Sequence, residues 1–460
     1  MSPGTSRESR RMGPGASRRG KRMHPGESRH YTAWLRPAVF ALGAVACLPA
    51  QPAELRGQTV DVTPFLSAES AEARHEASRA LVADSVSAEA VYRALEAGRD
   101  YDVLVATGRV EAARPGDREE PYRYFFVVPE TYDPGRRYPV RFYLHGGVSR
   151  PARGTGGAWW SRWEGLASED HISVFPQAWA ESTWWTGDQV DNLRLILSDL
   201  KRQYNVDENR ATVTGVSDGG TGAYYLGMKD PTPWAALFPF IGSPGVLLNP
   251  RVGAEGGIHM GNLINTPLYI VNGETDRLYP VRSVEPYLRS FSEAGVPFEF
   301  HPQPGGHDTS FWPGLAESID AFHHNFPRDP HPERVVWATE SEGHFPRAHW
   351  VVIEEVGHID GDEGRAALAG LTESGQAAVV DARRTGNTVL LQVFHAPRVR
   401  LLISPAVFDL TEPIRVVFNG TEVFTGRVEP SVETLLKWTA RDDDRTMLYL
   451  AELEVSAPGS

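Results

Sequence analysis

Short apolar runs alternate with amphipathic segments over residues 116–328. Runs rich in β-branched and aromatic residues are typical of buried strands and lie at 138–144, 172–175, 211–216, 268–273 and 297–302. Between them, apolar residues recur every three or four positions, around 190–204 and again over 281–294, which is typical of helices packed on a sheet. This alternation predicts an α/β fold with a mainly parallel sheet and helices on both faces.

The pattern changes after a proline-punctuated segment, "FPRDPHPE" at residues 326–333. Strand-like runs such as "TVLLQVF" (388–394) then follow one another without helical periodicity. Asn419-Gly420 separates two such runs and predicts a type I′ hairpin turn, which requires positive φ at both residues. With Thr421 it also fits a glycosylation acceptor, although the hairpin explains it sufficiently. We therefore predict a C-terminal all-β accessory domain, a sandwich, over residues 329–460.

The N-terminal region has the pattern of an export signal over residues 1–52. Basic residues precede an apolar run at 38–50 that is too short for a stable membrane span. The single cysteine, Cys47, is expected to be a processed signal residue. Lipid attachment there is the less favoured alternative, because Ala44 stands where a lipoprotein signal usually has leucine. Residues 64–98 are rich in Ala, Glu and Ser and predict that residues 53–115 form a helical arm or a pro-segment that packs on the rest of the protein.

Charge and cysteine content exclude several classes of function. Residues 1–52 carry nine Lys and Arg against two Glu, so the remaining chain has a net charge of −20 within the total of −13. An acidic body argues against nucleic acid or an anionic membrane as a partner. If Cys47 is removed with the signal, the mature protein has no disulfide, thiolate metal site or cysteine nucleophile.

A glycine-rich turn, "GVSDG" at residues 215–219, follows a predicted strand and precedes a predicted helix. It fits the G-x-S-x-G pattern, in which a serine occupies a strained turn and the flanking glycines let strand and helix approach closely. A chance glycine-rich turn would fit the five letters alone but not their position. Ser217 is therefore the candidate nucleophile.

A second glycine turn, His145-Gly146-Gly147, follows the strand at 138–144. Such a turn can direct backbone N–H groups at a developing oxyanion, with the amide of Asp218 as second donor. Alone, the motif would equally fit an ordinary strand exit. Because it precedes the serine turn, we expect Gly147 and Asp218 to form an oxyanion hole.

Two further candidates lie just after later strands, where the carboxyl ends of parallel strands share one sheet edge. Asp276 follows the strand at 268–273, and His307 lies in a glycine-rich loop after the next strand. A neutral imidazole can take the serine proton while a carboxylate holds its other nitrogen, so activity should fall in acid. Glu274 and Asp308 are the rivals for the acid. The neighbouring histidines are expected to be structural: His301, His323 and His324.

These motifs resemble those of the α/β-hydrolase superfamily, over residues 116–328. More narrowly, they are similar to secreted feruloyl/acetylxylan esterases, polyhydroxybutyrate depolymerases and prolyl-oligopeptidase-type serine hydrolases. The likeness rests on "PYRYFFVVPETYDPGRRYPVRFYLHGG", "NVDENRATVTGVSDGGTGAYYLG" and "VNGETDRLYP…GGHD". It implies Ser217 as nucleophile, Asp276 as acid, His307 as base, and the amides of Gly147 and Asp218 as oxyanion donors. Asp207 and Arg210 resemble a structural pair of that superfamily.

Tryptophans are frequent between the two glycine turns: Trp159, Trp160, Trp163, Trp179, Trp184 and Trp185. Most are expected to pack in the core, whereas Trp184 and Trp185 are the candidates for lining a pocket that binds a sugar or an aryl acid. No metal-ligand spacing is present, and no cofactor is expected. The acidic runs "GDEG" (361–364) and "RDDDR" (441–445) are expected to be solvated turns.

The sequence thus predicts a secreted or periplasmic serine hydrolase that cleaves small or polysaccharide-linked carboxylic esters through an acyl-enzyme. Two alternatives stay open: a prolyl-oligopeptidase-type peptidase, and a non-catalytic carbohydrate- or polymer-binding protein on a hydrolase scaffold. The intact trio of Ser217, Asp276 and His307 counts against the binding protein. The C-terminal domain holds none of these residues, so its expected roles are packing, dimer contact or holding a polymeric ligand.

Overall fold

The structure, a computed structural model, describes residues 60–68, 70–84, 86–116, 120–152, 154, 164–359 and 377–459. The predicted export signal, Cys47, the acidic run at 361–364 and three of the tryptophans (Trp159, Trp160 and Trp163) lie outside these residues. Among the residues that are described, no helix has the length and apolar character needed to cross a membrane.

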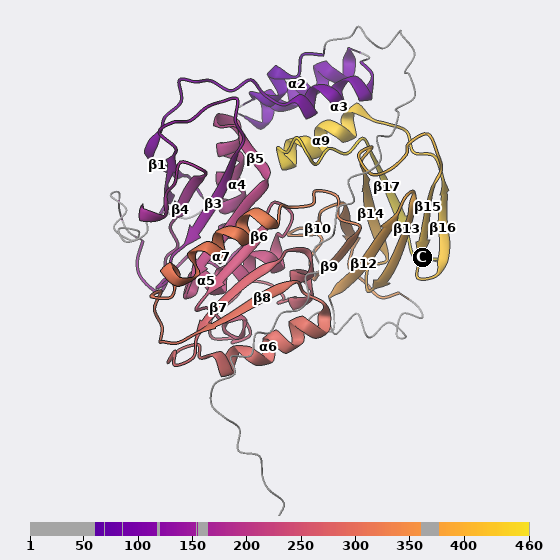
Figure 1. Cartoon of the computed structure of the whole chain (residues 1–460). Helices are drawn as coiled ribbons and strands as arrows, with labels where there is room; N and C mark the ends of the chain where they lie inside the picture. The colour runs from indigo at the N-terminus through magenta and orange to yellow at the C-terminus, as the bar shows by residue number, and fades with distance from the viewer. Residues whose placement is uncertain are drawn as a thin grey trace, which may run out of the picture. The chain divides into compact units, whose positions relative to one another are not determined.

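An eight-stranded sheet has the strand order β1-β2-β4-β3-β5-β6-β7-β8 (Figure 1). β1 and β2 pair antiparallel, β2 pairs antiparallel with β4, and the pairs from β4 to β8 are parallel. The strands are β1 (Gly108–Arg114), β2 (Tyr122–Val128), β3 (Tyr138–Leu144), β4 (Ile172–Pro176), β5 (Val206–Val216), β6 (Ala236–Phe240), β7 (Leu268–Gly273) and β8 (Phe298–Gln303). The predicted α/β-hydrolase fold is confirmed, although β1 begins before the expected boundary at residue 116.

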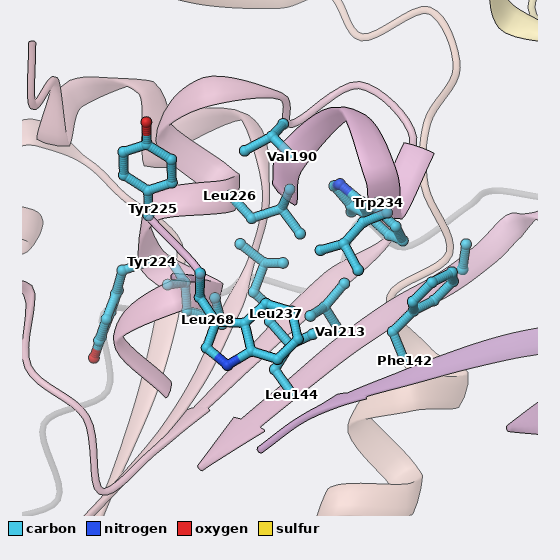
Figure 2. Close-up of a cluster of buried hydrophobic side chains, with 14 of the residues drawn as sticks. Phe142, Leu144, Val190, Val213, Tyr224, Tyr225, Leu226, Trp234, Leu237 and Leu268 are labelled. Atoms are coloured by element: carbon cyan, nitrogen blue, oxygen red, sulfur yellow. The ribbon is translucent and has the colours of Figure 1, made fainter. Parts of the chain in front are cut away.

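Helices cover both faces of this sheet because strand side chains alternate between them. The helices are α4 (Gly187–Gln203), α5 (Asp218–Lys229), α6 (Val281–Ala294) and α7 (Trp312–Asn325). Leu237 of β6 packs with Val190 of α4 and Leu226 of α5 in the larger core cluster, which Figure 2 shows. The next residue, Phe238, faces the opposite way and meets Phe322 of α7, with ring centroids 5.5 Å apart.

Two further sheets form the C-terminal domain, with strand orders β10-β11-β14-β17 and β16-β15-β13-β12-β9. Their strands are β9 (Arg334–Thr339), β10 (Arg347–Ala348), β11 (Val351–Glu355), β12 (Ala378–Thr385), β13 (Thr388–Phe394), β14 (Arg398–Ile403), β15 (Ile414–Phe418), β16 (Thr421–Gly426) and β17 (Ala451–Ser456). Buried residues of both sheets share one core, as in a sandwich. The hairpin prediction is confirmed, because Asn419 and Gly420 have φ of 49° and 85° between β15 and β16. The domain is not all-β, since it contains helix α9 (Val432–Asp442).

The N-terminal arm contains three helices: α1 (Thr63–Leu66), α2 (Ala71–Ala83) and α3 (Ala88–Ala97). Ser70 and Ser87 cap α2 and α3 by accepting hydrogen bonds from Ala73 and Ala90 amides. Apolar residues of the arm share a core cluster with Leu435 and other residues around α9. The arm therefore packs on the helix of the C-terminal domain.

The acidic run at 442–444 is buried, contrary to the expected solvated turn. Asp444 Oδ2 accepts a 2.7 Å hydrogen bond from Arg328, and Lys201 Nζ of α4 lies 3.6 Å away. Burial opposes ionisation of Asp444, but Arg328 and Lys201 outweigh this and lower its pKa. Asp442 accepts two hydrogen bonds of 2.9 Å from Arg347. Burial of a charge requires a partner of opposite sign, and this run has its partners in distant parts of the chain.

The flanking residues extend the same ionic interface. Asp443 accepts a 2.6 Å hydrogen bond from Arg99, in the segment that follows the arm helices. Arg445 donates a 2.6 Å hydrogen bond to Glu208 of β5. The loop after α9 thus connects the C-terminal domain to the hydrolase domain and to the segment between α3 and β1.

Candidate active site

Ser217 occupies a sharp turn between β5 and α5. Its φ of 57° and ψ of −117° lie in a region that costs a non-glycine residue about 1–3 kcal/mol. The turn is held by a 2.9 Å hydrogen bond from the Ser217 amide to the carbonyl of Phe240. A side chain at Gly215 would overlap the carbonyl of Gly219, and one at Gly219 would overlap the carbonyl of Leu144. The expected strand-to-helix elbow is present, and it requires glycine at both positions.

His307 lies between Ser217 and Asp276. Its Nε2 is 2.8 Å from Ser217 Oγ, and its Nδ1 is 2.8 Å from Asp276 Oδ2. The three residues come from the ends of three different strands, β5, β7 and β8, which share one sheet edge. This arrangement lets Nδ1 donate to the carboxylate while Nε2 accepts from the serine hydroxyl.

The carboxylate of Asp276 is fully buried, and hydrogen bonds fix its orientation. Its Oδ1 accepts from the amides of Leu278 (2.7 Å) and Tyr279 (3.1 Å), while Oδ2 faces His307. The two rivals, Glu274 and Asp308, are exposed, and no hydrogen bond or ion pair joins either carboxylate to the imidazole in the part of the chain that the structure describes. Asp276 is the carboxylate that the structure places beside the histidine.

Tyr279 flanks the imidazole and was not singled out in the sequence. Its ring centroid is 5.7 Å from that of His307, at an interplanar angle of 70°. Burial raises the pKa of the Tyr279 hydroxyl, and the nearby charges of Asp218 and Asp276 add to this effect. Its position three residues after Asp276, in a turn whose amides bind that carboxylate, is the signal that could have indicated it.

The glycine turn after β3 lies directly against Ser217. A Cβ on Gly146 would be 2.9 Å from the Ser217 Cβ, and Gly147 has φ of 71°. The Val148 amide donates a 2.9 Å hydrogen bond to Asp218 Oδ2, which ties this turn to the start of α5. The Asp218 amide belongs to the first turn of α5, where helix N–H groups have no acceptor within the helix. Gly147 and Asp218 are thus adjacent to Ser217, where oxyanion donors would be needed.

His145 supports this turn. Its Nε2 accepts a 3.1 Å hydrogen bond from the Ala178 amide, so the neutral ring carries its proton on Nδ1, which is 2.9 Å from the carbonyl of Gly146. The His145 carbonyl accepts a 2.8 Å hydrogen bond from Trp184 Nε1. The histidine of the "HGG" motif thus positions backbone groups.

Trp184 and Trp185 do not line an open pocket. Only 2% of Trp184 and 6% of Trp185 is exposed, and both belong to the larger core cluster. Trp184 packs so tightly under α5 that a side chain at Gly222 would overlap it. The two tryptophans follow β4, as expected. The prediction that they line a substrate pocket is wrong, because both rings are buried in the core.

The other histidines near the site have partners elsewhere. Burial lowers the pKa of His323 well below its ordinary value, and its Nδ1 is 3.0 Å from Thr212 Oγ1. His301 Nε2 is 3.1 Å from Glu299 and His324 Nδ1 is 2.8 Å from the Asp320 carbonyl. The expected pair is also present, with Arg210 Nε 3.4 Å from Asp207.

Comparisons with known proteins give structural likenesses only. No protein-family model and no curated protein matches the chain. Among solved structures, a thermostable esterase is similar at 22% identity over 46% of this chain and 62% of its own, with a TM-score of 0.36. A ferulic acid esterase is similar at 17% identity over 48% of this chain and all of its own (TM-score 0.36). Porphyromonas gingivalis dipeptidyl peptidase 4 is similar at 15% identity over 48% of this chain and 36% of its own (TM-score 0.38).

Proposed function

We propose that this protein is a serine hydrolase that cleaves carboxylic esters through an acyl-enzyme on Ser217. One observation carries the proposal: the continuous chain from Ser217 Oγ through His307 to the buried carboxylate of Asp276, with both hydrogen-bond distances at 2.8 Å. A protein that only binds a ligand would need neither a strained serine nor an oriented imidazole.

Acylation begins when Ser217 Oγ attacks the ester carbonyl and His307 Nε2 takes its proton. Asp276 holds the resulting imidazolium through Nδ1–H, and the amides of Gly147 and Asp218 donate to the oxyanion. Collapse of the tetrahedral intermediate breaks the bond to the alkoxy oxygen, which receives the proton from His307. Water, deprotonated by the same nitrogen, then attacks the acyl-enzyme and returns the acid and free Ser217.

Esters are favoured over peptides because of the leaving group. An alkoxide or phenoxide leaves more readily than an amine, so an ester needs less assistance from the site.

Labelling with a fluorophosphonate probe and turnover of an ester panel test the proposal. Ser217→Ala should abolish labelling and lower turnover of p-nitrophenyl acetate by about 10⁴-fold or more. Ser290→Ala, at an exposed serine of α6, is the matched control and should leave both unchanged. The panel adds p-nitrophenyl butyrate, methyl ferulate, acetylated xylan, and prolyl and alanyl p-nitroanilides. A kcat/KM for an anilide above that of every ester would favour the peptidase, and a folded protein that does not label would favour the binding protein.

The same proposal includes export of the protein from the cytoplasm and the chemical class of its substrate. The basic and apolar pattern of residues 1–52 supports secretion or a periplasmic location, with cleavage near the end of that segment. The acidic body supports a small or polysaccharide-linked ester as partner rather than nucleic acid. N-terminal sequencing of protein recovered outside the cytoplasm would locate the cleavage and show whether Cys47 is retained.

A further inference from the structure

Arg150 lies beside the candidate oxyanion turn. Its Cζ is 3.6 Å and its Nε 3.7 Å from the position that a Cβ on Gly147 would take. The preceding residue, Gly146, lies next to Ser217, since a Cβ added to Gly146 would be 2.9 Å from the Ser217 Cβ and 3.5 Å from its Oγ. Neighbouring Cα atoms are only about 3.8 Å apart, so the guanidinium group is within reach of a small substrate bound at Ser217.

Hydrogen bonds hold the backbone around Arg150, whereas its guanidinium has no ion-pair partner within the described ranges. The Arg150 carbonyl accepts a 2.8 Å hydrogen bond from the Ala180 amide, and the neighbouring Ala178 amide donates to His145. The side chain is exposed and forms no ion pair with any Asp or Glu in the described ranges. Asp218, the carboxylate tied to this turn, binds the Val148 amide. The guanidinium donors of Arg150 are therefore available to a ligand.

We propose that Arg150 selects esters that carry a carboxylate close to the scissile bond, on the acyl or the leaving-group side. The inference rests on the proposed esterase function and names its substrate class. The planar donors of a guanidinium match a carboxylate in two parallel hydrogen bonds. Residues 53–460 carry a net charge of −20, so the protein as a whole repels an anion, and a local cation at the site offsets this repulsion.

Two pairs of esters that differ in one charge test the proposal on the full-length protein. For the leaving-group side, 4-acetoxybenzoate is compared with its methyl ester. For the acyl side, phenyl 4-carboxybenzoate is compared with phenyl 4-carbamoylbenzoate. The variants are Arg150→Gln, Arg150→Lys and, as a charge-matched control on the exposed side of α6, Arg289→Gln. Comparing each variant with the wild type on the same ester cancels the intrinsic reactivity of the ester.

Arg150→Gln should lower kcat/KM for the carboxylate member of at least one pair by about 10-fold, as expected for a solvent-accessible charge-assisted contact. The loss should lie mainly in KM, because the contact is made in both the bound substrate and the transition state. Arg150→Lys should recover part of it, Arg289→Gln should change nothing, and added salt should weaken the wild-type preference for the anion.

Equal effects of Arg150→Gln on charged and neutral members, or no effect on either carboxylate ester, would overturn the proposal. In both cases normal hydrolysis of the neutral esters, lost in Ser217→Ala, would leave the esterase function standing. A wild-type protein that hydrolyses none of the four esters would overturn the proposal for Arg150, and one that also hydrolyses no ester of the panel above would overturn the esterase function as well.

Discussion

Arg328 Nη2 lies 2.7 Å from Asp444 Oδ2, and only 2% and 1% of these two side chains is exposed. Arg328 belongs to the segment between the hydrolase and C-terminal domains, and Asp444 to the loop after α9. The same guanidinium donates to Asn209 and to the carbonyl of Thr232 in the hydrolase domain. A buried cluster of charges therefore holds the two domains together.

Asp444→Ala should destabilise the protein by about 3–5 kcal/mol, because it leaves Arg328 and Lys201 buried without a counter-charge. Urea unfolding monitored by tryptophan fluorescence measures the change. Glu422→Ala is the control, since it breaks an ion pair with Arg415 in which both side chains are 49% exposed and screened by solvent, so it should change the free energy of unfolding far less. Equal costs for the two variants would mean that the buried cluster contributes little.

Deleting residues 329–460 should give a chain that does not fold, even though Ser217, His307 and Asp276 all precede the deletion. The truncation removes the partners of Lys201 and Glu208 and uncovers the apolar arm residues that pack around α9. Circular dichroism and fluorophosphonate labelling of the truncated chain check this. A soluble, folded and labelled fragment would show that the C-terminal domain is separable.

Asp276→Asn should lower kcat by about 10⁴-fold while leaving the fold intact, because an amide cannot hold the imidazole in the required tautomer. Glu274→Gln and Asp308→Asn should retain activity close to wild type, since His307 Nδ1 faces Asp276 and is hydrogen-bonded to neither of the other carboxylates among the described residues. Turnover of p-nitrophenyl acetate compares the three. Loss of activity in Glu274→Gln with a nearly active Asp276→Asn would contradict the assignment of the acid.

Gly215→Ala should prevent folding or cost several kcal/mol, because its methyl group would overlap the backbone of Gly219 at the elbow. Gly314→Ala is the matched control, since nothing lies within 4 Å of its added Cβ in α7, and alanine there should be neutral or stabilise by up to about 1 kcal/mol. Thermal unfolding of both variants gives the comparison. A Gly215→Ala protein as stable as wild type would show that the turn can relax.

The elbow at Ser217 and the hydrogen-bonded chain of Ser217, His307 and Asp276 could be predicted, because the chemistry expected of them demands particular residues after particular strands. Ser217, Asp276 and His307 each follow a strand, and parallel strands bring their ends to one edge. The directions of Trp184 and Trp185 could not be predicted, because a sequence gives a ring's place along the chain and not the face it turns to. The burial of Asp442–Asp444 was missed for a similar reason. Three adjacent carboxylates usually indicate a solvated turn, and their partners at Arg328, Lys201 and Arg347 are distant in sequence.

Two buried histidines near this cluster predict how the free energy of unfolding depends on pH. His349 is 2% exposed and His331 5%, and neither ring nitrogen of His349 has a hydrogen-bond partner among the described residues. Burial and the nearby charges of Arg328 and Arg347 lower the pKa of His349 to about 3. Burial lowers the pKa of His331 to about 4. Both side chains are therefore neutral in the folded protein at pH 5, where an unfolded histidine, with a pKa of about 6.5, is mostly protonated.

Because the unfolded state binds more protons below pH 6.5, the protein should lose stability as the pH falls from 7 to 5, by about 2 kcal/mol for each such histidine. His349→Asn should flatten this dependence, and asparagine tolerates the φ of 48° at this position. Urea unfolding at pH 7, 6 and 5 measures the slope. His75→Asn, at an exposed histidine of α2, should keep the wild-type slope. An unchanged slope in His349→Asn would contradict this prediction. It would mean that His349 has the same protonation state in the folded and unfolded protein, so that its burial does not cause the loss of stability in acid.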